Sequence, residues 1–119
     1  MTTTNLTAAD FETTITENSI VLIDFWASWC GPCRAFAPVF DRSSESHPDV
    51  VHAKVDTEAQ QELAAALEIQ AIPTIMAFRD GILVYRQPGA MPAAGLEDLV
   101  TRVKALDMAD VRAKIAANS

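Results

Sequence analysis

The run from Ile20 to Trp26 constrains the fold of this chain more than any other segment. It reads IVLIDFW, so every residue except Asp24 is apolar, and β-branched and aromatic side chains dominate. A near-continuous apolar run of this length is typical of a central strand that is covered on both of its faces. We therefore expect an α/β fold in which helices lie on both sides of a sheet.

The rest of the chain alternates between helical and extended patterns. Apolar spacing predicts helices over about residues 8–17, 31–46, 58–68 and 92–106, and strands over residues 49–55, 75–78 and 82–85. Thr7, Thr57 and Asp107 are the expected N-caps of the first helix, the third helix and a short further helix. Residues 79–81 join the last two strands as a hairpin, so the sheet is expected to be mixed.

Composition limits the kinds of partner that the chain can have. Its formal net charge is -7, from 16 acidic and 9 basic residues, and no cluster of lysine or arginine occurs. Phosphate binding needs concentrated positive charge, so nucleic acid is not an expected partner. No secretion signal and no apolar run of about 20 residues is present, which predicts a soluble, cytoplasmic protein without a membrane span.

The only two cysteines lie in the motif WCGPC, directly after the apolar run. Cys30 is expected where a strand ends and a helix begins, so free N–H groups and the positive end of the helix dipole lower the pKa of its thiol. Cys33 lies on the same side of the first turn, close enough for a disulfide if the turn tightens slightly. Gly31 tolerates unusual dihedrals, and Pro32 suits a first helical turn.

Two other interpretations of the cysteine pair stay open at this point. The pair could be half of a zinc site, for which His47 and His52 are the remaining ligand candidates, or it could be two inert cysteines. The uncharged Gly-Pro spacer favours redox chemistry in the reducing direction, because a charged spacer would stabilise the thiolate and make the disulfide more oxidising.

Two further residues have alternative interpretations. Asp24 is either a desolvated carboxyl with a raised pKa or a carboxylate at a solvated strand end, and the pattern does not decide between them. Pro73 precedes a predicted strand, and general statistics favour a trans peptide bond before it.

The chain resembles the thioredoxin family over about residues 6–106. The matching segments are VLIDFWA (residues 21–27), WCGPC (29–33), Pro38, AKV (53–55), IPT (72–74), Phe78, Gly81 and Gly89-Ala90. The resemblance implies a thioredoxin fold and a general protein-disulfide reductase with no bound cofactor and no metal. It also implies recharging by a flavin- and NADPH-dependent thioredoxin reductase, a monomeric state, and substrates such as peroxiredoxins, ribonucleotide reductase and methionine sulfoxide reductase.

The resemblance also assigns roles to residues. It implies that Cys30 is the exposed nucleophile, that Cys33 is the buried resolving thiol, and that Asp24, with Lys54 as a polar neighbour, assists proton transfer at Cys33. It implies a cis bond before Pro73, which faces the disulfide, and this reverses the general expectation. The apolar docking surface for partners would consist of Trp29, Gly31, Pro32, Ile72, Gly89 and Ala90.

The chain departs from the family pattern at three places. Arg34 and Ala71 stand where many members have lysine and glycine, and residues 107–119 extend past the usual end of the fold. We therefore expect a thioredoxin domain over residues 1–106, followed by an extension that forms a docked or frayed helix or contacts a partner. Two alternative functions remain: a binding module that uses the fold without redox chemistry, and an oxidase or isomerase, which the neutral spacer disfavours.

Overall fold

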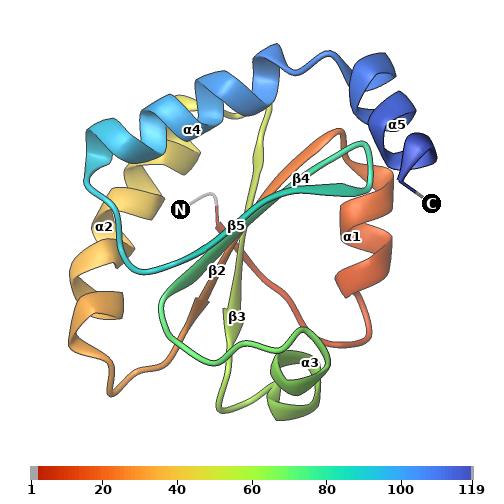
Figure 1. The fold of residues 1–119 in the computed structure, drawn as a ribbon. Helices are drawn as coiled ribbons and strands as arrows, with labels where there is room; N and C mark the ends of the chain where they lie inside the picture. Colours follow the sequence, from red (N-terminus) through yellow and green to blue (C-terminus); the bar gives the residue numbers. More distant parts are fainter. Residues whose placement is uncertain (1–2, 119) are drawn as a thin grey trace.

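The computed structural model describes residues 3–118, which contain five strands and five helices (Figure 1). Strands and helices alternate as far as β4, which is followed by β5 and then by two helices. Their bounds are β1 (Thr3–Asn5), α1 (Phe11–Glu17), β2 (Ile20–Trp26), α2 (Gly31–Ser46), β3 (Val51–Asp56), α3 (Gln61–Ala66), β4 (Thr74–Arg79), β5 (Ile82–Pro88), α4 (Ala93–Ala105) and α5 (Met108–Ala117). The strands form one mixed sheet in the order β1-β3-β2-β4-β5. The expected α/β fold is confirmed.

Strand β2 is the centre of the sheet, as its sequence predicts. It pairs in parallel with β3 and antiparallel with β4, and residues 21–25 are fully buried. Side chains alternate between faces along a strand. One apolar cluster therefore joins Leu22 to α2 and α4, and a second joins Val21 and Ile23 to α1 and α3. Asp24 shares the face of Leu22, beneath α2.

Three local expectations differ from the structure. Strand β1 was not expected, because Thr3, Thr4 and Asn5 show no apolar alternation; they form a strand only by pairing in parallel with β3. Helix α1 begins at Phe11 and not after Thr7, because the N–H and hydroxyl of Thr7 bond to the carboxylate of Asp10 and make a turn there.

Helix α3 is also shorter than expected. The carboxylate of Asp56 accepts hydrogen bonds from the N–H groups of Glu58 and Ala59, at 2.9 and 3.3 Å, which turns the chain before the helix begins at Gln61. Thr57 is not the N-cap. Its side chain bonds to the carbonyl of Trp26 in the neighbouring strand.

The C-terminal helices pack around the β4–β5 hairpin, where the short helix expected after Asp107 is present as α5. The carboxylate of Asp107 caps it by accepting from the N–H of Asp110 at 3.2 Å. Met108 is buried, and Arg112 forms an ion pair with Asp80 in the hairpin turn at 3.3 Å. Figure 1 shows α5 beside this hairpin, after the end of α4. Among the described residues, no helix is long and apolar enough to cross a membrane.

Candidate functional site

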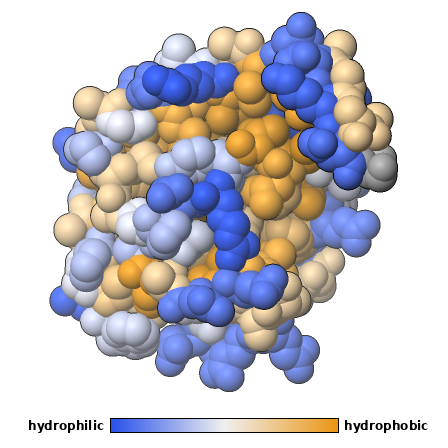
Figure 2. Space-filling model, in the orientation of Figure 1, coloured by the Kyte–Doolittle hydropathy of each residue, from blue (hydrophilic) through white to orange (hydrophobic). Residues whose placement is uncertain are grey.

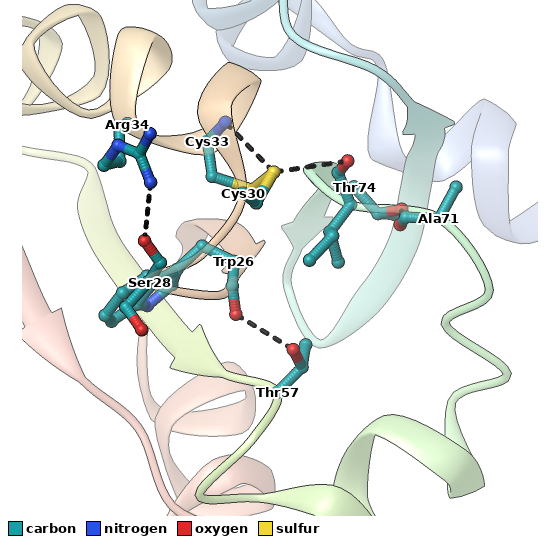
Figure 3. Close-up of a disulfide and its surroundings, with 9 residues drawn as sticks. Trp26, Ser28, Cys30, Cys33, Arg34, Thr57, Ala71 and Thr74 are labelled. Carbon is teal, nitrogen blue, oxygen red and sulfur yellow. Dashed lines mark hydrogen bonds between the residues drawn. A yellow bond between two sulfur atoms is a disulfide. The ribbon is translucent and has the colours of Figure 1, made fainter.

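The two cysteines form a disulfide at the junction of β2 and α2 (Figure 3). Their Cα atoms lie 5.2 Å apart, within the usual range for a disulfide. Cys30 is the N-cap of α2, and its sulfur accepts a hydrogen bond from the N–H of Cys33 at 3.2 Å. Pro32 lies in the first turn, where its missing N–H breaks no helical bond. Strand end, helix start and paired cysteines therefore coincide as expected.

The expectation of an exposed Cys30 is wrong for this oxidised state. Cys30 is 5% exposed and Cys33 2% exposed, so both are buried and the difference between them is small. The disulfide packs with Ala27, and Trp26 and Ile72 lie against this cluster. The sulfur of Cys30 also lies 3.7 Å from the carbonyl oxygen of Ile72. Only a small part of Cys30 is therefore open to a partner in this state.

The residues on either side of Cys30 in the chain are open to solvent. Trp29 is 66% exposed, and Gly31 and Pro32 are exposed as well. Gly31 does not adopt a positive φ, so its tolerance of unusual dihedrals is not used in this state. A Cβ at Gly31 would meet no atom within 4 Å, so the glycine leaves free space above the first turn of α2.

The bond between Ile72 and Pro73 is cis, as the family resemblance implies and against the general statistics. Pro73 is buried and Ile72 half-buried. The carbonyl of Pro73 accepts from the N–H of Gly89 at 2.7 Å, and Gly89 has a φ of 103°, which favours glycine. This bond brings the exposed residues Gly89 and Ala90 next to the proline.

Asp24 is a buried carboxyl, which decides between its two interpretations. It is 0% exposed, and neither of its oxygens has a hydrogen-bond partner in residues 3–118. Burial raises the pKa of Asp24 from 3.8 to about 7, the charge of Lys54 opposes this, and the nearby carboxylate of Asp41 adds to it. The group can thus hold or release a proton near neutral pH.

Lys54 lies beside Asp24, directly opposite it in the β2–β3 register. Its ammonium nitrogen lies 5.2 Å from the centre of the Trp26 ring, a cation–π contact. Lys54 is therefore held over Trp26 on the same face of the sheet as Asp24.

Sequence reasoning missed two side chains that bond to the chain just before Cys30. Arg34 donates from Nη1 to the carbonyl of Ser28 at 2.9 Å, and Thr57 donates from its hydroxyl to the carbonyl of Trp26 at 3.0 Å. Figure 3 shows the bond from Arg34 on the side of the disulfide away from Ala71 and Thr74, and the bond from Thr57 below the disulfide. The departure of Arg34 from the family pattern was the only indication of its contact.

The two histidines are engaged elsewhere. His52 is fully buried, with Nε2 2.8 Å from the hydroxyl of Ser43 and Nδ1 3.1 Å from the carbonyl of Val50. His47 bonds to Glu97 at 2.6 Å and to Lys104 at 3.1 Å. In the part of the chain that the structure describes, no three metal-ligating side chains form a group. The candidate functional site is therefore a disulfide at the N-terminus of a helix, with a titratable carboxyl under that helix.

Comparison with known proteins identifies relatives of this chain. The Thioredoxin family profile matches residues 2–102. The protein named "Putative thioredoxin 2" of Streptomyces coelicolor is 51% identical over 114 residues, which are 96% of this chain and 85% of that protein.

Solved structures agree with the sequence relatives. A mutant thioredoxin from Halobacterium salinarum superposes with a TM-score of 0.80 at 32% identity, covering 87% of this chain and 91% of that one. A structure described as the basis of thiol resolution in yeast mitochondrial 1-Cys peroxiredoxin through glutathione and thioredoxin systems superposes with a TM-score of 0.76. It is 32% identical, and 87% of this chain and 95% of that one are covered.

Proposed function

This chain belongs to the thioredoxin family, and from that premise we propose that it reduces disulfide bonds in other proteins, with Cys30 as nucleophile and Cys33 as resolving thiol. Membership makes it a protein-disulfide oxidoreductase that acts by thiol–disulfide exchange through its own cysteine pair, without a bound cofactor. The reducing direction and the order of attack are the proposal. The observation that carries it is the position of Cys30 as N-cap of α2.

The reaction proceeds in two exchanges. In the dithiol form, the Cys30 thiolate attacks one sulfur of the substrate disulfide, forms a mixed disulfide and releases one substrate thiolate. The Cys33 thiolate then attacks the Cys30 sulfur, which re-forms the Cys30–Cys33 disulfide and releases the second substrate thiolate. The substrate gains two electrons and the protein loses two. Thioredoxin reductase returns them, drawing on NADPH through its flavin.

The surroundings of the pair support this order. The N–H of Cys33 points at the Cys30 sulfur at 3.2 Å, and the N-terminus of α2 favours negative charge there. Cys33 needs a proton acceptor before it can attack. Asp24, with a pKa of about 7, takes that proton and returns it in the next cycle, and Lys54 limits the rise of the carboxyl pKa.

Partner proteins dock on the apolar surface beside the disulfide. We assign this surface to Trp29, Gly31, Pro32, Ile72, Pro73, Gly89 and Ala90, of which most are exposed. Disulfide-bearing enzymes such as peroxiredoxins, ribonucleotide reductase and methionine sulfoxide reductase are the proposed substrates. We further propose that the protein acts as a cytoplasmic monomer without nucleic-acid partners, and that residues 1–106 form the thioredoxin domain and 107–119 an extension.

Insulin reduction driven by dithiothreitol tests this function. We expect the wild-type protein to accelerate the reaction and Cys30→Ser to abolish the acceleration. Arg102→Met, which changes an exposed residue of α4, is the matched control and should behave as wild type. Wild-type protein that is no faster than Cys30→Ser would refute the proposal.

A further inference from the structure

Residues 27–29 connect β2 to α2 and carry Trp29, the most exposed large apolar side chain in the described chain. We call this connection the Trp29 loop. Three consecutive carbonyls at its start accept hydrogen bonds: that of Trp26 at the end of β2, and those of Ala27 and Ser28 within the loop. The hydrogen bonds at the entry to the loop and at two of its own carbonyls restrain its backbone.

The donors come from both sides of the loop. The carbonyl of Ala27 accepts from the N–H of Cys30 at 3.2 Å. The carbonyl of Trp26 accepts from the N–H of Thr57 at 2.9 Å and from its hydroxyl at 3.0 Å. The carbonyl of Ser28 accepts from the guanidinium of Arg34 at 2.9 Å (Figure 3). Two of these donors are therefore side chains that can be removed without altering the backbone.

An anchored Trp29 loop matters for binding. Large aromatic side chains that enter a partner's pocket supply much of the energy of an interface. Ordering a mobile loop at the moment of binding reduces affinity, and a loop that is already fixed avoids this loss. Trp29 lies beside the disulfide and is 66% exposed. Fixing its loop should therefore raise the affinity for partners more than fixing any other part of the proposed docking surface.

We propose that Arg34 and Thr57 are positioning residues, which hold the Trp29 loop in the conformation that binds partner proteins at the Cys30–Cys33 disulfide. The inference rests on the proposed function, which gives the loop its partners. The side-chain hydrogen bonds of both residues go to backbone carbonyls and not to a sulfur atom, so each residue acts through the carbonyl that it binds.

The two residues should contribute unequally. The carbonyl of Ser28 depends on Arg34, whereas the carbonyl of Trp26 keeps the N–H of Thr57 when the hydroxyl is lost. A hydrogen bond of this kind changes an equilibrium about two- to tenfold. We expect losses near the upper end of this range for Arg34 and about twofold for Thr57.

The test compares a protein disulfide with a small one. Rate constants are measured for fully reduced protein reacting with insulin and with hydroxyethyl disulfide, which needs no docking surface. Arg34→Met and Thr57→Val should slow the insulin reaction and leave the small-disulfide reaction and the reduction potential unchanged. Arg34→Lys and Thr57→Ser, which each keep a donor, should restore the insulin rate.

A second readout reports on the loop itself. Nitrogen-15 relaxation should show lower order parameters for the amides of residues 27–29 and for the Trp29 indole in Arg34→Met than in wild type. Arg102→Met removes the same charge from α4 and should change neither the rates nor the order parameters. Thr57→Val changes no charge, so its effect separates loop position from electrostatics.

Each outcome decides the inference. Equal slowing with both disulfides would mean that Arg34 acts on the sulfur chemistry, and it would overturn the proposal. Unchanged insulin rates or unchanged order parameters in Arg34→Met would overturn it too. If wild-type protein reduces neither disulfide, the proposed function fails, and the relaxation data still decide whether Arg34 fixes the loop.

Discussion

Replacing Asp24 by asparagine should stabilise the folded protein above neutral pH and have little effect in acid. Asp24 is fully buried, without a hydrogen-bond partner in the described residues, and its pKa is raised from 3.8 to about 7. Between these two values the folded state binds the proton and the unfolded state does not. The contribution of Asp24 to stability is therefore present below pH 3.8 and is lost as the pH rises through about 7.

The magnitude follows from the two pKa values. One pKa unit corresponds to about 1.36 kcal/mol, so the difference between 3.8 and about 7 corresponds to about 4 kcal/mol. Asparagine has nearly the same shape and does not ionise. The stability of Asp24→Asn relative to wild type should therefore grow by about 4 kcal/mol between about pH 4 and about pH 8.

Urea unfolding of the oxidised proteins at a series of pH values measures this difference. Subtracting the free energy of unfolding of wild type from that of Asp24→Asn at each pH cancels the contributions of the titrating groups that both proteins share. Asp98→Asn, which changes an exposed carboxyl on α4, is the control and should shift stability by less than about 0.5 kcal/mol throughout. A stability difference between Asp24→Asn and wild type that does not vary with pH would refute the assignment of a neutral buried carboxyl.

Three further predictions concern other parts of the chain. Gly31→Ala should leave the free energy of unfolding unchanged or raise it by up to about 1 kcal/mol, because the added Cβ meets no atom within 4 Å. A decrease in the free energy of unfolding, measured in urea, would contradict the open geometry at Gly31. Burial lowers the pKa of His52 below 6.5, so the stability of the wild-type protein should fall as the pH drops below 6.5. The stability of His52→Gln, measured over the same pH range, should lack the part of this fall that His52 causes. Identical dependence of stability on pH in the two proteins would show that His52 is not held neutral. Asp107→Ala removes the N-cap of α5 and should destabilise this helix by about 1 kcal/mol. Hydrogen exchange of the α5 amides measures this change. Unchanged exchange rates would mean that packing alone holds the helix.

Local sequence patterns predicted the elements whose structure depends on local chemistry. The apolar run of β2 predicted a central strand, and the paired runs around Asp80-Gly81 predicted the β4–β5 hairpin; both are present. Strand β1 was missed because its polar residues become a strand only through pairing with β3. The starts of α1 and α3 were misplaced because Asp10 and Asp56 make turns that compete with a helix start.

The site was predictable to the extent that a motif carries it. WCGPC located the disulfide, and the family resemblance supplied the cis bond before Pro73. The burial of Asp24 could not be decided from sequence, because it depends on how α2 covers the sheet. The bonds from Arg34 and Thr57 to backbone carbonyls could not be foreseen, since they need the folded positions of both partners.

Trapping the reaction intermediate tests the central claim, reduction of protein disulfides by Cys30 with resolution by Cys33, most directly. Reduced Cys33→Ser protein is mixed with an oxidised protein substrate, and the disulfide-linked product is mapped by mass spectrometry. The account predicts a stable mixed disulfide through Cys30, because the resolving thiol is absent. No mixed disulfide with Cys33→Ser, together with a stable one through Cys33 in Cys30→Ser, would contradict it.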